Sequence, residues 1–158
     1  MRGEIAAPLL VGSVSLALIA GALVFQYAWS YPPCEICHWQ RWPHIAAAVI
    51  GLGGGLLVAV GALPARAARP MAWLTILAIA VAGALGVYHA GIEWKLWEGP
   101  ATCTGPGFVP GSGAEFTPFH FVRCDEAAWR FLGISLAGYN ALISFCVAGA
   151  GIALLRRR

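Results

Sequence analysis

The chain has 158 residues, of which 59% are hydrophobic and only 11% are charged. A soluble globular domain carries about 25% charged residues, so this sequence has too few to cover a surface in water. With a mean hydropathy of +0.74, the composition excludes a disordered chain, a nucleic-acid-binding arm and a small secreted disulfide-rich protein. We therefore expect a single membrane domain over residues 1–158 that contacts lipid and binds no nucleic acid.

Four apolar stretches are long enough to cross a membrane. A bilayer core about 30 Å thick requires roughly 20 apolar residues per helix, and backbone in lipid must satisfy its own hydrogen bonds, which favours helices. We predict an all-α, integral membrane four-helix bundle. The predicted spans are residues 5–27, 44–63, 71–90 and 132–155, which leave outward loops at 28–43 and 91–131. Glycine is frequent in the spans, and we expect it at helix contacts, where small residues permit close approach.

The first span has a competing interpretation as a cleaved secretory signal. Arg2 precedes the apolar run, and Ala28-Trp29-Ser30 carries small residues at the spacing of a cleavage site. The run is longer than the roughly 7–15 residues of a signal core. We therefore expect it to be retained as a membrane span.

The charges are divided unequally between the two sides of the predicted bundle. One side carries six arginines and one glutamate, whereas the other carries four basic and six acidic residues. By the positive-inside rule, both termini and the loop that contains Arg66 and Arg69 are cytoplasmic. The two outward loops are then periplasmic in a multi-pass protein of a bacterial inner membrane. The loop at 91–131 is rich in aromatic residues, among them Phe116–Val122, which favours an interfacial belt over a substrate groove.

Four of the five cysteines fall in the two outward loops. Cys34 and Cys37 share the first loop and Cys103 and Cys124 the second, while Cys146 lies in the fourth span as a small hydrophobe. An oxidising compartment favours disulfides. A structural bridge suits the second pair, which would stabilise the loop by about 3 kcal/mol on the chain-entropy model. It suits the first pair badly, because a CxxC bridge removes little loop entropy and CxxC is typical of redox-active dithiols.

Arg41 is a candidate partner of the CxxC motif. Pro32 and Pro33 end the preceding extended stretch, and a helix that begins near Cys34 would favour a thiolate through its N-terminal dipole. Cys37 and Arg41 are four residues apart, so they share a face once the helix has started, and the guanidinium keeps its charge. Two alternatives stay open. Pro43 is a second candidate for the helix start, and an arginine at the edge of a span commonly anchors it by snorkelling. The position four residues after the CxxC motif favours the functional interpretation of Arg41.

The sequence CEICH at residues 34–38 also matches the c-type haem attachment signature CxxCH. A haem would leave Cys103 and Cys124 unexplained, and its distal ligand would have to be His44, His89 or His120. A zinc site from the four cysteines is weaker still, because the second pair lacks ligand spacing. The sequence contains no dinucleotide-binding GxGxxG motif after a strand, so a lipid-soluble acceptor is the simplest destination for electrons.

The combined pattern resembles the disulfide bond formation protein B (DsbB) family. The resemblance rests on the four spans, the motif PCEICHWQR at residues 33–41 and a second cysteine pair in the long outer loop. It covers nearly the whole chain, and the order of the two pairs is its most specific part. The vitamin K epoxide reductase family is similar in helix count and chemistry but carries its CxxC late, which disfavours that assignment.

What the resemblance implies is an electron relay. A reduced DsbA-like thiol oxidoreductase of the periplasm would attack the Cys103–Cys124 disulfide at Cys103. Cys124 would then exchange with Cys34, and Cys37 would pass the electrons to a membrane quinone, either ubiquinone or menaquinone. The family's DsbA–DsbB–quinone system keeps the bacterial periplasm oxidising.

The resemblance also implies two further residues of the quinone site. Arg41 matches the family's quinone-assisting arginine, and His89 occupies a place where the family often has a histidine. A quinone is thus the expected cofactor, and no metal is expected. His38 and the Gly/Pro-rich stretch 105–113 depart from the family's pattern, and the latter leaves open which partner fits the loop. The competing hypotheses are a membrane-anchored c-type cytochrome and a non-catalytic assembly subunit whose disulfides are structural.

Overall fold

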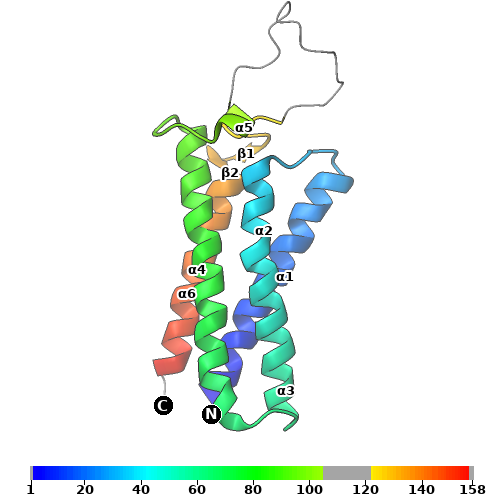
Figure 1. Cartoon of the computed structure of the whole chain (residues 1–158), viewed down its shortest axis with the longest axis vertical. Coiled ribbons are helices and arrows are strands. Elements are labelled where there is room, and N and C mark those ends of the chain that lie inside the picture. The colour runs from blue at the N-terminus through cyan, green and yellow to red at the C-terminus, as the bar shows by residue number, and fades with distance from the viewer. Residues whose placement is uncertain (1, 105–121, 157–158) are drawn as a thin grey trace, which may run out of the picture.

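A computed structural model of the chain describes residues 2–104 and 122–156 (Figure 1). Within these ranges, four helical segments are long and apolar enough to cross a membrane, at Gly3–Tyr27, Glu35–Ala59, Ala65–Glu93 and Leu136–Arg156. The prediction of an all-α, four-helix membrane bundle is therefore confirmed. The elements are α1 (Arg2–Tyr27), α2 (Glu35–Ala48), the π-helix η1 (Val49–Gly54), α3 (Gly55–Ala59), the 3₁₀-helix η2 (Ala65–Ala67), α4 (Ala68–Glu93), α5 (Ala101–Thr104), β1 (Arg130–Phe131), β2 (Ile134–Ser135) and α6 (Leu136–Arg156).

The two ends of the bundle differ in what they carry. Figure 1 shows the start of α1, the end of α6 and the η2 connection at one end, and α5 with the β1–β2 hairpin at the other. In the same view α1 leans away from α2 towards the hairpin end. All four outward cysteines lie at the hairpin end, because two spans separate the first pair from the second.

The second span begins nine residues earlier than the predicted residue 44, because α2 starts at Glu35. Cys34 caps this helix: its backbone is extended, and its side chain accepts a hydrogen bond from the backbone N–H of Cys37 at 3.2 Å. Pro43 lies inside the helix rather than at its start. The predicted loop at 28–43 is thus shortened, and the CxxC motif and Arg41 belong to the cap and first turns of a membrane helix.

The fourth span begins later than predicted, at Leu136 instead of residue 132. Residues 130–135 form the antiparallel β1–β2 hairpin, whose turn residues Leu132 and Gly133 both have positive φ angles and cannot continue a right-handed helix. Ser135 then caps α6 by accepting a hydrogen bond from the backbone N–H of Gly138 at 3.2 Å. This hairpin folds over the cysteine end of the bundle (Figure 1).

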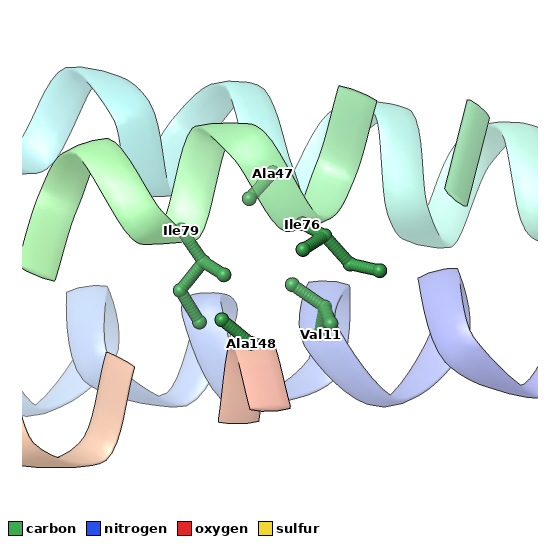
Figure 2. Packing of buried hydrophobic residues seen from close by; sticks show 5 residues of the cluster. All are labelled: Val11, Ala47, Ile76, Ile79 and Ala148. Carbon is green, nitrogen blue, oxygen red and sulfur yellow. The ribbon is translucent and has the colours of Figure 1, made fainter. Parts of the chain in front are cut away.

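The centre of the bundle is packed with small and β-branched side chains from all four spans. Figure 2 shows Val11 of α1, Ala47 of α2, Ile76 and Ile79 of α4 and Ala148 of α6 converging on one another. The small alanines let the helices approach closely, which is the packing mode expected in lipid.

The glycine prediction is confirmed at some positions and wrong at others. A Cβ on Gly86 would lie 2.9 Å from the Ala137 carbonyl oxygen, so α4 and α6 touch there because that position has no side chain. Gly53 and Gly149 instead have open space beside them, so they are not helix contacts within one chain.

Two other predicted features have different outcomes. Cys146 is exposed on the outer face of α6. The aromatic residues from Phe108 to Phe121, with His120, lie outside the described ranges.

Candidate redox site

The structure brings the four outward cysteines together at one end of the bundle. Cys103 in α5 and Cys124 form a disulfide. Cys34 packs in the same buried cluster as this disulfide, and Ile36 and Ile92 complete the cluster. Two cysteine pairs that are 66 residues or more apart in the sequence therefore share one apolar enclosure, which is the arrangement that exchange between them requires.

Cys34 and Cys37 lie in direct contact as free thiols, with their sulfur atoms 2.7 Å apart. The helix cap creates this contact, because the Cys37 N–H points at the Cys34 sulfur. The hydrogen-bonding contact with Cys37, together with burial, raises the pKa of Cys34 above the usual range of a thiol.

Arg41 follows Cys37 by one helical turn, and the two side chains line the same cavity. The cavity has a volume of about 480 Å³, within the usual range for small-molecule sites of roughly 300–1,000 Å³. Side chains such as Leu18 and Phe25 of α1 form apolar walls, and the polar side chains of His89 and Glu93 of α4 also line the cavity. Both CxxC sulfurs therefore face a cavity whose mostly apolar walls suit a flat, largely apolar molecule.

His89 lies against the first cysteine pair and is only 4% exposed. Its Nε2 atom is 3.6 Å from the Cys34 sulfur and 3.8 Å from a Glu93 carboxylate oxygen, while its Nδ1 atom is 2.9 Å from the amide nitrogen of Gln40. The backbone of Cys124 also hydrogen-bonds the ring. His89 therefore touches both cysteine pairs.

A chain of polar contacts continues from Gln40 into the middle of the bundle. Asn140 of α6 donates to the Gln40 side-chain oxygen at 2.6 Å, and its own side-chain oxygen lies 2.8 Å from Nε2 of His44. Ser15 of α1 and Ser144 of α6 complete the chain, at 3.4 Å from His44 and 3.0 Å from Asn140. Gln40, Asn140 and Glu93 are not among the site residues predicted from the sequence. Their signal was available, because polar side chains inside an apolar span are rare and mark functional sites.

Ion pairs fasten the segment that carries Cys124 to the end of α4. Asp125 pairs with Arg123 at 2.7 Å and with Lys95. Hydrogen bonds from these two cations lower the pKa of Asp125 to about 2, so the pairing persists throughout the physiological pH range. Thr102 beside Cys103 donates to the carboxylate of Glu35 at the start of α2. The basic partners of Asp125 remain accessible to solvent, so these ion pairs are weakened by salt.

The geometry does not favour the haem interpretation. A haem held through two thioethers requires both sulfurs to face the porphyrin, yet Cys34 is enclosed in the cluster around the Cys103–Cys124 disulfide. The candidate distal ligand His44 has both ring nitrogens in polar contacts. A four-cysteine zinc site is excluded in this state, because two of the sulfurs are bonded to each other.

The model of the family described as disulfide bond formation protein DsbB matches residues 5–154. The chain belongs to the DsbB family. The match covers all four spans and both cysteine pairs, so this DsbB-family chain is a disulfide-generating, multi-pass membrane oxidoreductase.

Individual relatives agree with the assignment to the DsbB family. A disulfide bond formation protein B of Polaromonas sp. (strain JS666 / ATCC BAA-500) is 28% identical over 161 residues, covering 94% of this chain and 88% of the relative. Another, from Aromatoleum aromaticum (strain DSM 19018 / LMG 30748 / EbN1), is 29% identical over 153 residues, covering 92% and 89%. An uncharacterised protein of Rickettsia prowazekii (strain Madrid E) is 25% identical over 141 residues, covering 85% and 78%. No solved structure gives a significant match.

Proposed function

We propose that this protein reoxidises a DsbA-like dithiol protein of the periplasm and passes the electrons to a quinone of the bacterial inner membrane. The observation that carries the proposal is the position of the CxxC pair. It lies between the buried Cys103–Cys124 disulfide on one side and an apolar cavity with a fixed cation, Arg41, on the other. A purely structural pair of bridges needs no such cavity.

The first half of the reaction is thiol–disulfide exchange. A thiolate of the partner attacks Cys103, which forms a mixed disulfide and releases Cys124 as a thiolate. Cys124 then exchanges with an oxidised Cys34–Cys37 pair at Cys34, and Cys37 leaves as a thiolate. The partner's second thiol attacks the partner's own sulfur in the mixed disulfide, which releases the oxidised partner and leaves Cys103 as a thiolate. Cys103 then attacks Cys124, which restores the loop disulfide and releases Cys34, so that Cys34 and Cys37 are left as a reduced dithiol. Two electrons and two protons have then moved from the partner to the protein, and the raised pKa of Cys34 is consistent with Cys37 as the leaving thiolate.

The second half requires an electron acceptor that reaches the site from the lipid. The cavity residues fit a quinone: apolar walls suit the ring and its isoprenoid tail, and Arg41 and His89 supply polar groups for the ring oxygens. When bound, the quinone supplies the capacity to accept two electrons and two protons. The chain's own residues would hold the ring beside Cys37, exclude water through the apolar walls, and stabilise negative charge through Arg41.

Both sulfurs of the loop disulfide are buried, Cys103 at 2% exposure and Cys124 at 0%. A folded partner cannot reach them without displacing the segment that carries Cys103. The polar contacts of this region, between Thr102 and Glu35 and around Asp125, face solvent and oppose this displacement only weakly. The packing of the disulfide against Ile36 and Ile92 is the larger contribution that the displacement must overcome.

The proposal predicts coupled loss of partner thiols and quinone. Purified protein in lipid, supplied with a reduced DsbA-like protein and excess quinone, should reduce about one quinone per dithiol oxidised. A variant with Cys34→Ser and Cys37→Ser should show neither reaction. Thiol titration and quinone absorbance measure the two sides independently. Thiol loss without quinone reduction, or a haem Soret band in the purified protein, would contradict the proposal.

The proposed orientation makes a separate prediction. Reporter fusions after Ala68 should score as cytoplasmic and fusions after Glu98 as periplasmic, because six arginines lie on the side of the termini. A fusion at the end of α6 provides the matched control and should again score as cytoplasmic. The reverse pattern would place the cysteines in a reducing compartment, where disulfide generation fails.

A further inference from the structure

The hydrogen bonds of the buried polar chain from Asn140 to His89 all donate in one direction, which a backbone carbonyl determines. The Asn140 side-chain nitrogen lies 3.1 Å from the backbone oxygen of Ala82. A carbonyl can only accept a hydrogen bond, so the –NH₂ group of Asn140 must face it. The same –NH₂ group lies 2.6 Å from Gln40, which must therefore present its oxygen to Asn140.

A second carbonyl fixes Gln40 in the same direction. With its oxygen towards Asn140, the –NH₂ group of Gln40 faces the backbone oxygen of Ile36 at 3.4 Å and Nδ1 of His89 at 2.9 Å. Reversing the Gln40 amide would place its oxygen against the Ile36 oxygen and its nitrogen against the nitrogen of Asn140. Two independent backbone acceptors thus agree on one orientation for both amides.

We infer that Gln40 and Asn140 are positioning residues that hold neutral His89 as the Nε2–H tautomer, so that His89 donates a hydrogen bond towards the Cys34 sulfur and cannot bind a metal ion together with the CxxC thiols. Nδ1 accepts the Gln40 hydrogen bond, so the ring proton resides on Nε2. That atom faces the Cys34 sulfur at 3.6 Å and a Glu93 oxygen at 3.8 Å, and both can accept a hydrogen bond.

The tautomer of His89 affects metal binding here, because the CxxC sulfurs and the imidazole are otherwise close enough together to hold a metal ion. The Cys34 and Cys37 sulfurs and a His89 nitrogen all lie within 4.8 Å of one another. Two thiolates and an imidazole are preferred zinc ligands, but the imidazole binds through an unprotonated nitrogen. Freeing Nε2 would move the proton to Nδ1, where it would meet the –NH₂ group of Gln40. A dithiol that must cycle in the periplasm is thereby protected from capture by zinc.

The hydrogen bond to Cys34 deepens the proposed function and rests on it. Cys34 is the sulfur that leaves when the loop disulfide re-forms in that reaction, and a fixed N–H beside it stabilises negative charge on that sulfur as it leaves. The tautomer and the metal affinity are properties of the protein alone. They can be measured without partner or quinone, so a failure of the proposed function leaves them unaffected.

The tautomer can be read directly by nitrogen-15 NMR of histidine-labelled protein in detergent or nanodiscs. The chain has four histidines, and His89→Phe assigns the signal. We expect the His89 proton on Nε2, with Nδ1 unprotonated. An Nδ1–H ring, or a ring with both nitrogens protonated at neutral pH, overturns the inference. This measurement needs no substitution in the polar chain and holds even if variants of that chain fold poorly.

The isosteric substitution Gln40→Glu tests the same inference through metal binding. A carboxylate at residue 40 accepts a hydrogen bond from Nδ1–H, which favours the ring proton on Nδ1 and so frees Nε2. This creates the carboxylate–histidine–metal arrangement of zinc sites. In a Cys103→Ser, Cys124→Ser background, which leaves Cys34 and Cys37 as the outward thiols, the reduced protein should bind Zn²⁺ about 10–100-fold more tightly than its Gln40 parent. Competition with a chromophoric zinc chelator measures the affinity.

Added negative charge alone would also attract Zn²⁺, so the control repeats Gln40→Glu in a His89→Phe background. We expect the gain in affinity to disappear there, because no imidazole remains to be freed. An equal gain in both backgrounds, or no gain with His89 present, overturns the inference. Asn140→Asp should act in the same direction as Gln40→Glu, since it removes the donor that orients Gln40.

Discussion

Replacing Cys124 with serine should convert a transient complex with the partner into a stable one. Cys103 would still form a mixed disulfide with the partner, but the thiol that resolves it would be missing. Turnover with a dithiol partner and quinone should fall to the background rate. We expect this to be one of the two largest effects of a single substitution, because no other residue can replace a sulfur that exchanges.

The trap can be made quantitative with a partner that retains only its attacking cysteine, activated as a mixed disulfide with a chromophoric thiol. In a background that also carries Cys34→Ser, Cys37→Ser and Cys146→Ser, Cys103 of the reduced Cys124→Ser variant should release one chromophore per chain and form a covalent complex that persists. In the parent, Cys124 should attack Cys103 and free the partner. Cys146→Ser is the matched control and should leave turnover intact, since this sulfur lies on the outer face of α6. Complexes that form through Cys34 after the loop pair is removed would disprove the order.

The spans were predictable because each is a long apolar run, and the even number of crossings follows from them. The start of α2 was not, because residues 35–43 are polar enough to lower the local hydropathy although they continue the helix. Cap geometry decides the boundary: the extended Cys34 that follows Pro33 accepts the Cys37 N–H. Residues 35–43 have the low hydropathy of a loop, yet their backbone hydrogen bonds make them the first turns of α2.

Of the residues in the site, only the redox-active cysteines could be predicted from the sequence by their chemistry and spacing. Spacing identifies Cys34 and Cys37 as a redox pair, and the resemblance supplies Arg41 and His89. The polar chain that supports His89 links residues 40 and 140, and such long-range pairs leave no periodic pattern in a single sequence. Averaging over an apolar window also hides a lone asparagine or glutamate. The useful signal is the individual polar residue inside a span, considered by itself.

Arg41→Gln should slow the quinone step and leave exchange at Cys103 nearly unchanged. Arg41 lines the cavity one turn after Cys37, where apolar walls keep the local dielectric low and make a fixed charge effective. A guanidinium there favours the Cys37 thiolate and stabilises negative charge as electrons arrive at the acceptor. Removing a preorganised group of this kind costs about 10²–10³-fold in rate. Lysine at residue 41 should restore part of the activity, because it keeps the charge and loses the planar fork.

The measurement separates the two half-reactions. Steady-state oxidation of a reduced dithiol partner at varied quinone reports the second step, and single-turnover formation of the mixed disulfide at Cys103 reports the first. Arg66→Gln is the matched control: it removes the same charge from an exposed residue in η2, at the opposite end of the bundle, and should change neither step. If Arg41→Gln folds normally and keeps the parent's dependence on quinone, then Arg41 only anchors α2 at the membrane boundary. The acceptor must in that case receive its electrostatic stabilisation from His89 or from the N-terminal dipole of α2.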